Sequence, residues 1–427
     1  MNLEIVTIGD ELLLGFTIDT NAAHLARAFA ALGVRIVRRS TCGDDAESIA
    51  DAVRSALERT GAVITTGGLG PTADDQTKPA IGGLFGKRMV LDEEILDALE
   101  RRWLARFGHP LPTSNRQQAM VPEGATILEN RHGSAPGIWL EDAQGRWVAM
   151  LPGVPREMRG MVADTLTPRL RDRIAAGGPV IRSRTLRTAN IAESALADRL
   201  GDLAAGVNGL SLAYLPGRDG VDLRLTSYSL PAMETERALT AAATLVRDKV
   251  GRFIYGEGED DLAALMLAEC GARQATIAVA ESCTGGLLGM RLTSAPGSSQ
   301  VVLGGTIAYA NDVKIRELDV AAEDIDAHGA VSEPVARAMA AGVRRRFGST
   351  IGLGITGIAG PGGGTPDKPV GTVWVAVDIG GEVHAVRAVL PGDRDEIRWR
   401  AAQLALDRLR LAFARNTEGP GWMARGA

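Results

Sequence analysis

A serine and a cysteine stand side by side in a loop that joins an apolar run to a helical one. The run 276–280 predicts a buried strand, and Ser282 and Cys283 follow it. Thr284 and two glycines then lead into the amphipathic stretch 287–292. This layout puts Ser282 at the carboxyl end of a strand and beside a helix amino terminus. Unpaired backbone N–H groups and the helix dipole favour anions and developing oxyanions there.

A second glycine-rich strand end follows at 354–361. Two such loops in one domain indicate a pocket for a phosphorylated small molecule. Either loop alone is equally compatible with an ordinary strand-to-helix turn.

Ser282 needs a base before it can act as a nucleophile. His328 and His384 form no apparent Ser-His-acid set, which favours Lys314. A lysine desolvated in a pocket has a lowered pKa and can accept the serine proton, with the Tyr309 hydroxyl relaying or orienting that proton. The alternatives are structural: Ser282 as a helix cap, Lys314 on a surface turn and Tyr309 as a packing residue.

Two more residues bear on this chemistry. Thr356, at the end of the neighbouring strand, could donate to the oxyanion or orient the substrate amide. Cys283 is a rival nucleophile. In a continued strand Ser282 and Cys283 would point to opposite faces, and a small buried thiol is the commoner fate of a free cysteine.

The amino-terminal part holds another glycine-rich strand end at 67–72. Asp74 and Asp75 follow it and are expected in the first turn of the next helix, where acids favour the helix dipole. The functional alternative is that both face a divalent cation bridging phosphates, together with Asp10 or Glu157.

Composition bounds the possible functions. The 427 residues are 45% hydrophobic and 23% charged, with a net charge of -5, which suits two to four globular domains. This acidic balance disfavours a main role on nucleic acid or an anionic membrane. The three cysteines lie far apart, as expected in a reducing compartment. With no signal-like amino terminus and no membrane-length apolar run, a cytoplasmic protein is expected.

Alternating strand and helix patterns predict an α/β protein with three domains and a tail. Residues 1–173 predict a doubly wound parallel sheet with ligands at the carboxyl ends of the strands. Residues 179–256, after the break Gly177-Gly178-Pro179, predict a small α+β spacer or dimerisation domain with a hairpin at 216–220. Residues 260–415 predict a further α/β domain, and 416–427 a disordered tail.

The third domain resembles the carboxy-terminal domain of the CinA family, the competence/damage-inducible protein A group. Matching segments run through most of it: 281–286, 294–299, 305–309, 328–333, 356–361 and 368–373, with Lys314 between them. The resemblance implies a nicotinamide mononucleotide deamidase, which forms nicotinate mononucleotide and ammonia without a cofactor.

On this sequence the resemblance implies Ser282 as nucleophile, Lys314 as base, Tyr309 in support and Thr356 at the reacting amide. The nucleotide phosphate is expected on the glycine loops and on arginines at the start of the last helix, where a bidentate guanidinium suits the task. The expected substrate-binding residues here are Thr284, Gly285, Gly286, Gly357, Gly360, Arg394 and Arg398.

The first domain resembles the molybdopterin-binding fold in its CinA-type version, through 8–13, 67–75, 135–137 and 151–158. Ser134 stands where the family more often has threonine, which keeps the hydroxyl. The resemblance implies a metal-dependent ADP-ribose pyrophosphatase using cobalt, manganese or magnesium. Its expected phosphate-binding residues are Gly67, Gly68, Gly70 and Thr72, and its expected metal ligands are Asp10, Asp74, Asp75 and Glu157.

Together these expectations describe a bifunctional hydrolase of pyridine nucleotide recycling, acting on nicotinamide mononucleotide and ADP-ribose and forming a homodimer. Two alternatives stay open. One is a non-catalytic partner protein in competence or the DNA-damage response, and the other is a pterin-binding first domain.

Overall fold

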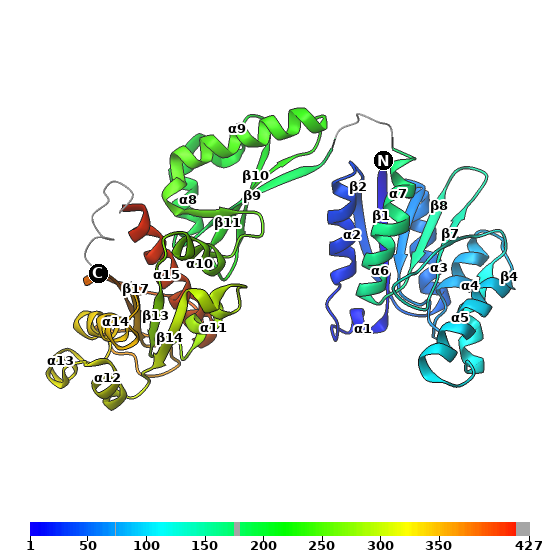
Figure 1. The fold of residues 1–427 in the computed structure, drawn as a ribbon. Coiled ribbons are helices and arrows are strands. Elements are labelled where there is room, and N and C mark those ends of the chain that lie inside the picture. Colours follow the sequence, from blue (N-terminus) through cyan, green and yellow to red (C-terminus); the bar gives the residue numbers. More distant parts are fainter. Residues whose placement is uncertain (73, 175–179, 416–427) are drawn as a thin grey trace. The chain divides into compact units, whose positions relative to one another are not determined.

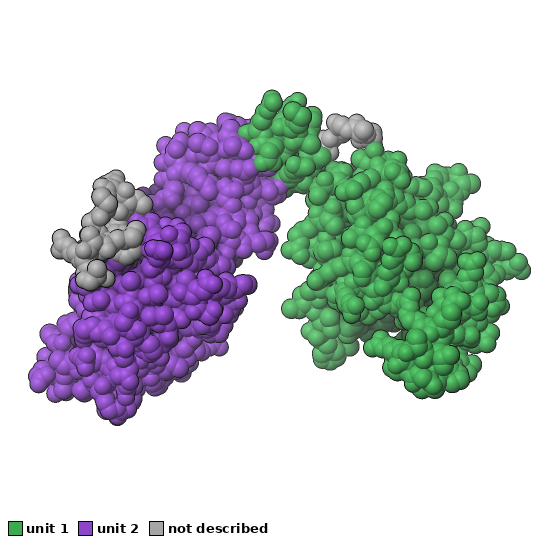
Figure 2. Space-filling view, in the orientation of Figure 1, with its two compact units in different colours: residues 1–182, 227–237 green, residues 183–226, 238–427 purple. Residues whose placement is uncertain are grey.

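The computed structural model describes residues 1–72, 74–174 and 180–415. The chain forms two compact units, residues 1–182 with 227–237 and residues 183–226 with 238–427 (Figure 2). The predicted break at Gly177-Gly178-Pro179 and the predicted disordered tail lie outside the described residues. Among the described helices, none combines the length and the apolar character that a membrane span requires.

A six-stranded sheet forms the centre of unit 1 (Figure 1). Its strand order is β2-β1-β3-β8-β7-β6, in which β2, β1, β3 and β8 run parallel and β7 and β6 are antiparallel. The strands are β1 (Asn2–Ile8), β2 (Arg35–Cys42), β3 (Ala62–Thr66), β6 (Thr126–Leu128), β7 (Gly137–Glu141) and β8 (Trp147–Leu151). The predicted doubly wound fold is confirmed, with antiparallel strands added at one edge.

Helices cover both faces of this sheet, as burial of a largely parallel sheet requires. Helix α2 (Thr20–Ala30) packs through Leu25 and Phe29 with α6 (Pro155–Met161) on one face, and α3 (Ala46–Thr60) packs through Ile49 on the other. The Asp19 carboxylate caps α2 by accepting a hydrogen bond from the Ala22 amide at 2.9 Å. Unit 1 also contains α1 (Asp10–Leu13), α4 (Thr77–Leu84), β4 (Met89–Leu91), α5 (Glu93–Phe107), β5 (Met120–Pro122) and α7 (Thr167–Arg171).

The middle part of the chain forms a four-stranded sheet in the order β10-β11-β9-β12. Its elements are β9 (Arg182–Thr188), α8 (Glu193–Leu200), β10 (Ser211–Pro216), β11 (Val221–Ser227), α9 (Ala232–Val250) and β12 (Ile254–Glu257). Strands β10 and β11 pair antiparallel from Ser211↔Thr226 to Pro216↔Val221, which confirms the predicted hairpin.

The carboxy-terminal part of unit 2 is built on a five-stranded sheet in the order β14-β13-β15-β16-β17. Strands β14, β13 and β15 run parallel, and β16 and β17 continue the sheet antiparallel. The strands are β13 (Ile277–Glu281), β14 (Val302–Ile307), β15 (Ile351–Gly357), β16 (Thr372–Ile379) and β17 (Glu382–Val389). The helices are α10 (Leu262–Ala272), α11 (Leu287–Thr293), α12 (Asn311–Leu318), α13 (Ala322–His328), α14 (Glu333–Phe347) and α15 (Arg394–Arg415).

Strand residues alternate between the two faces of this sheet. In β13, Ile277 and Val279 join a core formed with α10, α11 and α15, whereas Ala278 and Ala280 pack with α12 and α14. Helix α14 lies directly on β15, because a Cβ atom at Gly354 would stand 2.7 Å from the carbonyl oxygen of Ala336. The even-numbered positions of β13 and β15 therefore share the face that α14 covers.

Candidate active site

Ser282 lies where β13 leaves the sheet. Its amide donates to the carbonyl of Ile355 at 2.9 Å, so the pairing of β13 with β15 extends one residue beyond Glu281. By alternation, Ser282 follows Ala278 and Ala280 onto the face of α12 and α14. Ser282 is 9% exposed.

Cys283 points the other way, into the core that contains α15. Its burial raises the pKa of the thiol to about 12, so the thiol stays protonated at neutral pH. Because the thiolate is the reactive form of cysteine, this residue is a poor nucleophile. The expected burial of one of the two neighbours is confirmed for Cys283.

Lys314 occupies the face on which Ser282 lies. Its ammonium donates to the carbonyls of Ala308 at 2.8 Å and Tyr309 at 3.1 Å, and the residue is 1% exposed. The Ala308 amide donates to the carbonyl of Glu281 at 2.8 Å, which puts Ala308 beside Ser282 at the end of the adjacent strand. Lys314 therefore reaches the strand end next to Ser282, and the surface-turn alternative is wrong.

The surroundings of Lys314 shift its protonation toward the neutral amine. Burial lowers the pKa of Lys314, and the neighbourhood of Cys283 only partly opposes this. A neutral amine carries two N–H groups and one lone pair, and the two carbonyls accept the N–H groups. The lone pair is then free to take a proton.

Thr356 is also on the α14 face and neighbours Ser282 across the β13–β15 pairing. Its hydroxyl donates to the carbonyl of Ala330 at 2.7 Å. Because its single hydroxyl proton is already in the hydrogen bond to Ala330, Thr356 can accept a hydrogen bond but cannot donate one to an oxyanion in this conformation. Of the two expected roles, donation to the oxyanion and orientation of the substrate amide, only the second is compatible with this hydrogen bond. In that role the Thr356 oxygen accepts a hydrogen bond from the amide.

Two arginines at the start of α15 connect the surrounding loops. Arg394 donates to the carbonyl of Gly360 at 2.5 Å and to the hydroxyl of Tyr309 at 2.8 Å. Arg398 donates to the carbonyl of Thr284 through two nitrogens and pairs with Asp395. The structure thus brings Arg394, Arg398 and Tyr309 to the same strand ends as the predicted catalytic residues.

The predicted anion site on the amino terminus of α11 is wrong in this conformation. The Glu281 carboxylate accepts from the amides of Gly286, Leu288 and Gly289 at 2.8–3.0 Å, and the Gly285 amide donates to the carbonyl of Ser282. These N–H groups are therefore engaged by the protein itself. Sequence reasoning missed Glu281, although an acid a few residues before a helix can fold back onto its free amides.

Glu281→Gln should destabilise the carboxy-terminal part by about 2–4 kcal/mol, because a carboxamide has one acceptor oxygen and its NH₂ would face an amide donor. Urea denaturation followed by circular dichroism measures this loss. Glu317→Gln is the control, because Glu317 pairs with Arg316 and Arg346 near the surface and should lose less than about 1 kcal/mol. Equal losses in both variants would contradict the capping role of Glu281.

In unit 1 the glycine loop after β3 is shaped by close packing. A Cβ atom at Gly67 would stand 2.1 Å from the carbonyl oxygen of Ile8, and one at Gly68 would stand 2.1 Å from the Thr77 hydroxyl. The Asp75 carboxylate accepts from the Gly70 amide at 2.7 Å and from the amide and hydroxyl of Thr72. Both carboxylate oxygens of Asp75 thus brace the loop.

The structure does not assemble the predicted metal ligands Asp10, Asp74, Asp75 and Glu157. Helix α4 begins at Thr77, so Asp74 and Asp75 precede the helix instead of forming its first turn. Glu157 accepts from the Asn130 side chain at 2.6 Å. Across residues 1–72, 74–174 and 180–415, no three His, Cys, Asp or Glu side chains converge in a way that could hold a metal ion.

A cavity of about 510 Å³ nevertheless adjoins the glycine loop of unit 1, lined among others by Gly70, Thr72, Asp75 and Lys78. Burial lowers the pKa of Lys78 to about 8, and its ammonium donates to the carbonyls of Gln117 and Gln118. Sequence reasoning missed Lys78. Glu157 lines a different cavity, of about 340 Å³, with His132 and Arg156.

Comparison with protein families divides the chain into three matches. Residues 4–172 match the probable molybdopterin binding domain, 183–256 the damage-inducible protein CinA KH domain and 259–413 the CinA C-terminal domain. The spacer or dimerisation role assigned to the middle part stays a prediction.

Relatives match over the whole chain. A CinA-like protein of Gemmatimonas aurantiaca is 77% identical over 100% of both chains, and one of Salinibacter ruber is 44% identical over 97% of this chain and 100% of its own. The crystal structure of the competence/damage inducible protein CihA from Agrobacterium tumefaciens is 38% identical, covering 35% of this chain and 92% of that chain with a TM-score of 0.35. By these full-length identities, the chain belongs to the CinA family.

Proposed function

We propose that the carboxy-terminal part hydrolyses the carboxamide of nicotinamide mononucleotide, releasing nicotinate mononucleotide and ammonia. The observation that carries the proposal is the buried Lys314 nitrogen, which donates to two carbonyls at the strand end beside Ser282. A lysine with a lowered pKa next to a serine has the chemistry of a base and nucleophile pair.

The proposed reaction has two steps. The Ser282 oxygen forms a bond to the carboxamide carbon while its proton passes to the Lys314 amine. The carbon–nitrogen bond then breaks, and the Lys314 ammonium returns the proton to the departing ammonia. Water attacks the resulting ester with Lys314 again as base, which frees the acid and restores the Ser282 hydroxyl.

The neighbouring groups suit a nucleotide amide. The Thr356 hydroxyl donates its hydrogen bond to the Ala330 carbonyl, so its oxygen accepts a hydrogen bond from the amide nitrogen of the substrate. Tyr309 accepts from Arg394, which leaves its own proton free to donate. A guanidinium has five N–H donors, so Arg394 and Arg398 keep N–H groups for a phosphate beyond those already engaged.

Ammonia release should persist in excess EDTA, within about twofold of the untreated rate, because serine and lysine supply both the nucleophile and the proton transfers. A coupled glutamate dehydrogenase assay measures the release, with EDTA also added to the coupling enzymes alone as the control. Loss of release that returns on adding a divalent cation would contradict the proposed chemistry.

We do not extend the proposal to an ADP-ribose pyrophosphatase in unit 1. The cavity beside Gly70 and Lys78 lies at the carboxyl end of β3, where open α/β sheets bind ligands. The carboxylates expected to hold a cation there do not fit one, because Asp75 braces its own loop and Glu157 lines another cavity. No metal-assisted step follows from this arrangement.

A further inference from the structure

Within unit 2, the hairpin tip between β10 and β11 covers a cavity of about 470 Å³. Residues 216–221 of the hairpin form one wall, and residues 388–391, at the end of β17 and just after it, form another. Arg400, Gln403 and Arg408 project from α15 and complete the lining. This volume is in the range of small-molecule sites in proteins.

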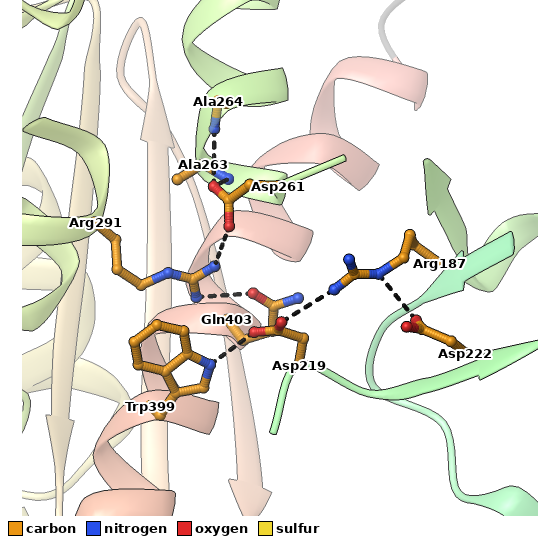
Figure 3. A network of polar contacts seen from close by, with 9 residues as sticks. All are labelled: Arg187, Asp219, Asp222, Asp261, Ala263, Ala264, Arg291, Trp399 and Gln403. Atoms are coloured by element: carbon orange, nitrogen blue, oxygen red, sulfur yellow. Dashed lines mark hydrogen bonds and ion pairs between the residues drawn. The ribbon is translucent and has the colours of Figure 1, made fainter. Parts of the chain in front are cut away.

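Three donors among these α15 side chains are buried without an acceptor. The Nε atoms of Arg400 and Arg408 and the Nε2 atom of Gln403 have no hydrogen-bond partner in the part of the chain that the structure describes. Gln403 is 2% exposed, and its Oε1 accepts from Arg291 at 2.8 Å, which fixes the orientation of the amide (Figure 3). Buried donors of this kind are rare and costly, so they call for an acceptor.

The cavity is also positively charged. Neither Arg400 nor Arg408 forms an ion pair with a described residue, and burial lowers the pKa of Arg408. Asp219 also lines the cavity, but its carboxylate is engaged by Arg187 at 3.1 Å and by the Trp399 indole at 2.7 Å (Figure 3). Arg218, on the same hairpin, lies over the Trp399 ring and adds a third guanidinium to the lining.

We propose that this cavity binds a small phosphomonoester, with the phosphate on Arg400, Arg408 and Gln403. Guanidinium groups with free N–H donors suit phosphate oxygens, and Ile191, Leu390 and Leu404 offer apolar wall to the body of the ligand. Gln403 is buried, so a ligand that contacts it must enter the cavity, which favours a small molecule over a polymer. No residue of the candidate active site lines this cavity, so the two sites are separate.

Isothermal titration of the full chain with AMP, and separately with inorganic phosphate, tests the proposal. The wild type should bind both probes, and the double variant Arg400→Gln/Arg408→Gln should lose roughly tenfold or more in affinity. Ala388→Phe, which fills the cavity but leaves both arginines, should also weaken binding. Arg345→Gln is the control, because Arg345 pairs with Asp319 at the surface and does not line the cavity. This variant should bind both probes as the wild type does.

The outcomes separate this site from the proposed active site. Arg398→Gln should leave AMP binding in this cavity unchanged, whatever it does to nucleotide binding and ammonia release at the candidate active site. The proposal is overturned if the wild type binds neither probe, or if Arg398→Gln abolishes binding while the double variant retains it. Thermal melting of each variant verifies that it is folded, and Ala388→Phe decides the matter if the double variant is not.

Discussion

Ser282→Ala should reduce ammonia release from nicotinamide mononucleotide by about 10⁴-fold or more, because it removes the nucleophilic oxygen that gives its proton to Lys314 in the first step of the proposed reaction. The substitution removes one oxygen atom from a residue that is 9% exposed. We therefore expect the fold and the affinity for the nucleotide to be retained. Steady-state ammonia assays and equilibrium titration measure the two quantities on the same preparation.

Cys283→Ala is the matched control for Ser282→Ala. The Cys283 thiol is buried in the opposite core and its pKa is raised to about 12, so its removal should change turnover by no more than about tenfold. The reverse pattern, with an active Ser282→Ala and an inactive but folded Cys283→Ala, would assign the nucleophile to the thiol.

Lys314→Met should lower turnover by about 10²–10⁴-fold, the usual contribution of a positioned general base. Methionine keeps most of the volume of the buried side chain but cannot accept a proton. The ammonia assay measures the loss. A folded Lys314→Met enzyme with wild-type turnover would remove Lys314 from the reaction.

The pH dependence gives a second readout of Lys314. Because burial lowers its pKa, wild-type turnover should rise with pH through a value below the ordinary 10.4 or so of lysine. Between the lowered folded pKa and the unfolded value, the unfolded chain holds a proton that the folded protein has released, so stability also rises with pH in this window. Lys314→Met should lose both rises, as pH–rate profiles and melting curves at several pH values can show.

Much of the fold could be predicted from sequence because its elements carry strong local signals. The predicted strand 276–280 corresponds to β13 (Ile277–Glu281), and the predicted hairpin at 216–220 joins β10 and β11. The Asp19 cap of α2 is such a signal, because an aspartate directly before a helical run is a preferred cap. The antiparallel strands β6 and β7 were missed, because short edge strands depend on partners that are distant in sequence.

The candidate site was partly predictable for the same reason. Parallel strands end at one edge of a sheet, so Ser282 and Thr356 could be expected near each other. The hydrogen-bond partner of each hydroxyl could not be predicted, because it depends on side-chain rotamers and on the positions of carbonyls such as that of Ala330. Likewise, the Glu281 carboxylate accepts hydrogen bonds from amides at the start of α11 that the sequence pattern alone predicts to be free.

The metal ligands expected in unit 1 are not brought together, because of the geometry of their side chains. Asp74 and Asp75 stand in a sequence typical of phosphate chemistry, yet Asp75 turns back to its own loop through Gly70 and Thr72. An acid that satisfies loop amides and an acid that binds a cation have the same sequence signature. Only the positions of the neighbouring donors separate them.

The most direct measurement looks for the ester that the two-step reaction requires. Enzyme mixed with nicotinamide mononucleotide and quenched in acid during the first turnover can be digested and examined by mass spectrometry. The peptide containing Ser282 should carry the nicotinate mononucleotide acyl group, and the same peptide from Ser282→Ala should not. Stoichiometric ammonia release in that turnover from enzyme whose Ser282 peptide stays unmodified, or an acyl group found on another residue, would contradict the proposed nucleophile.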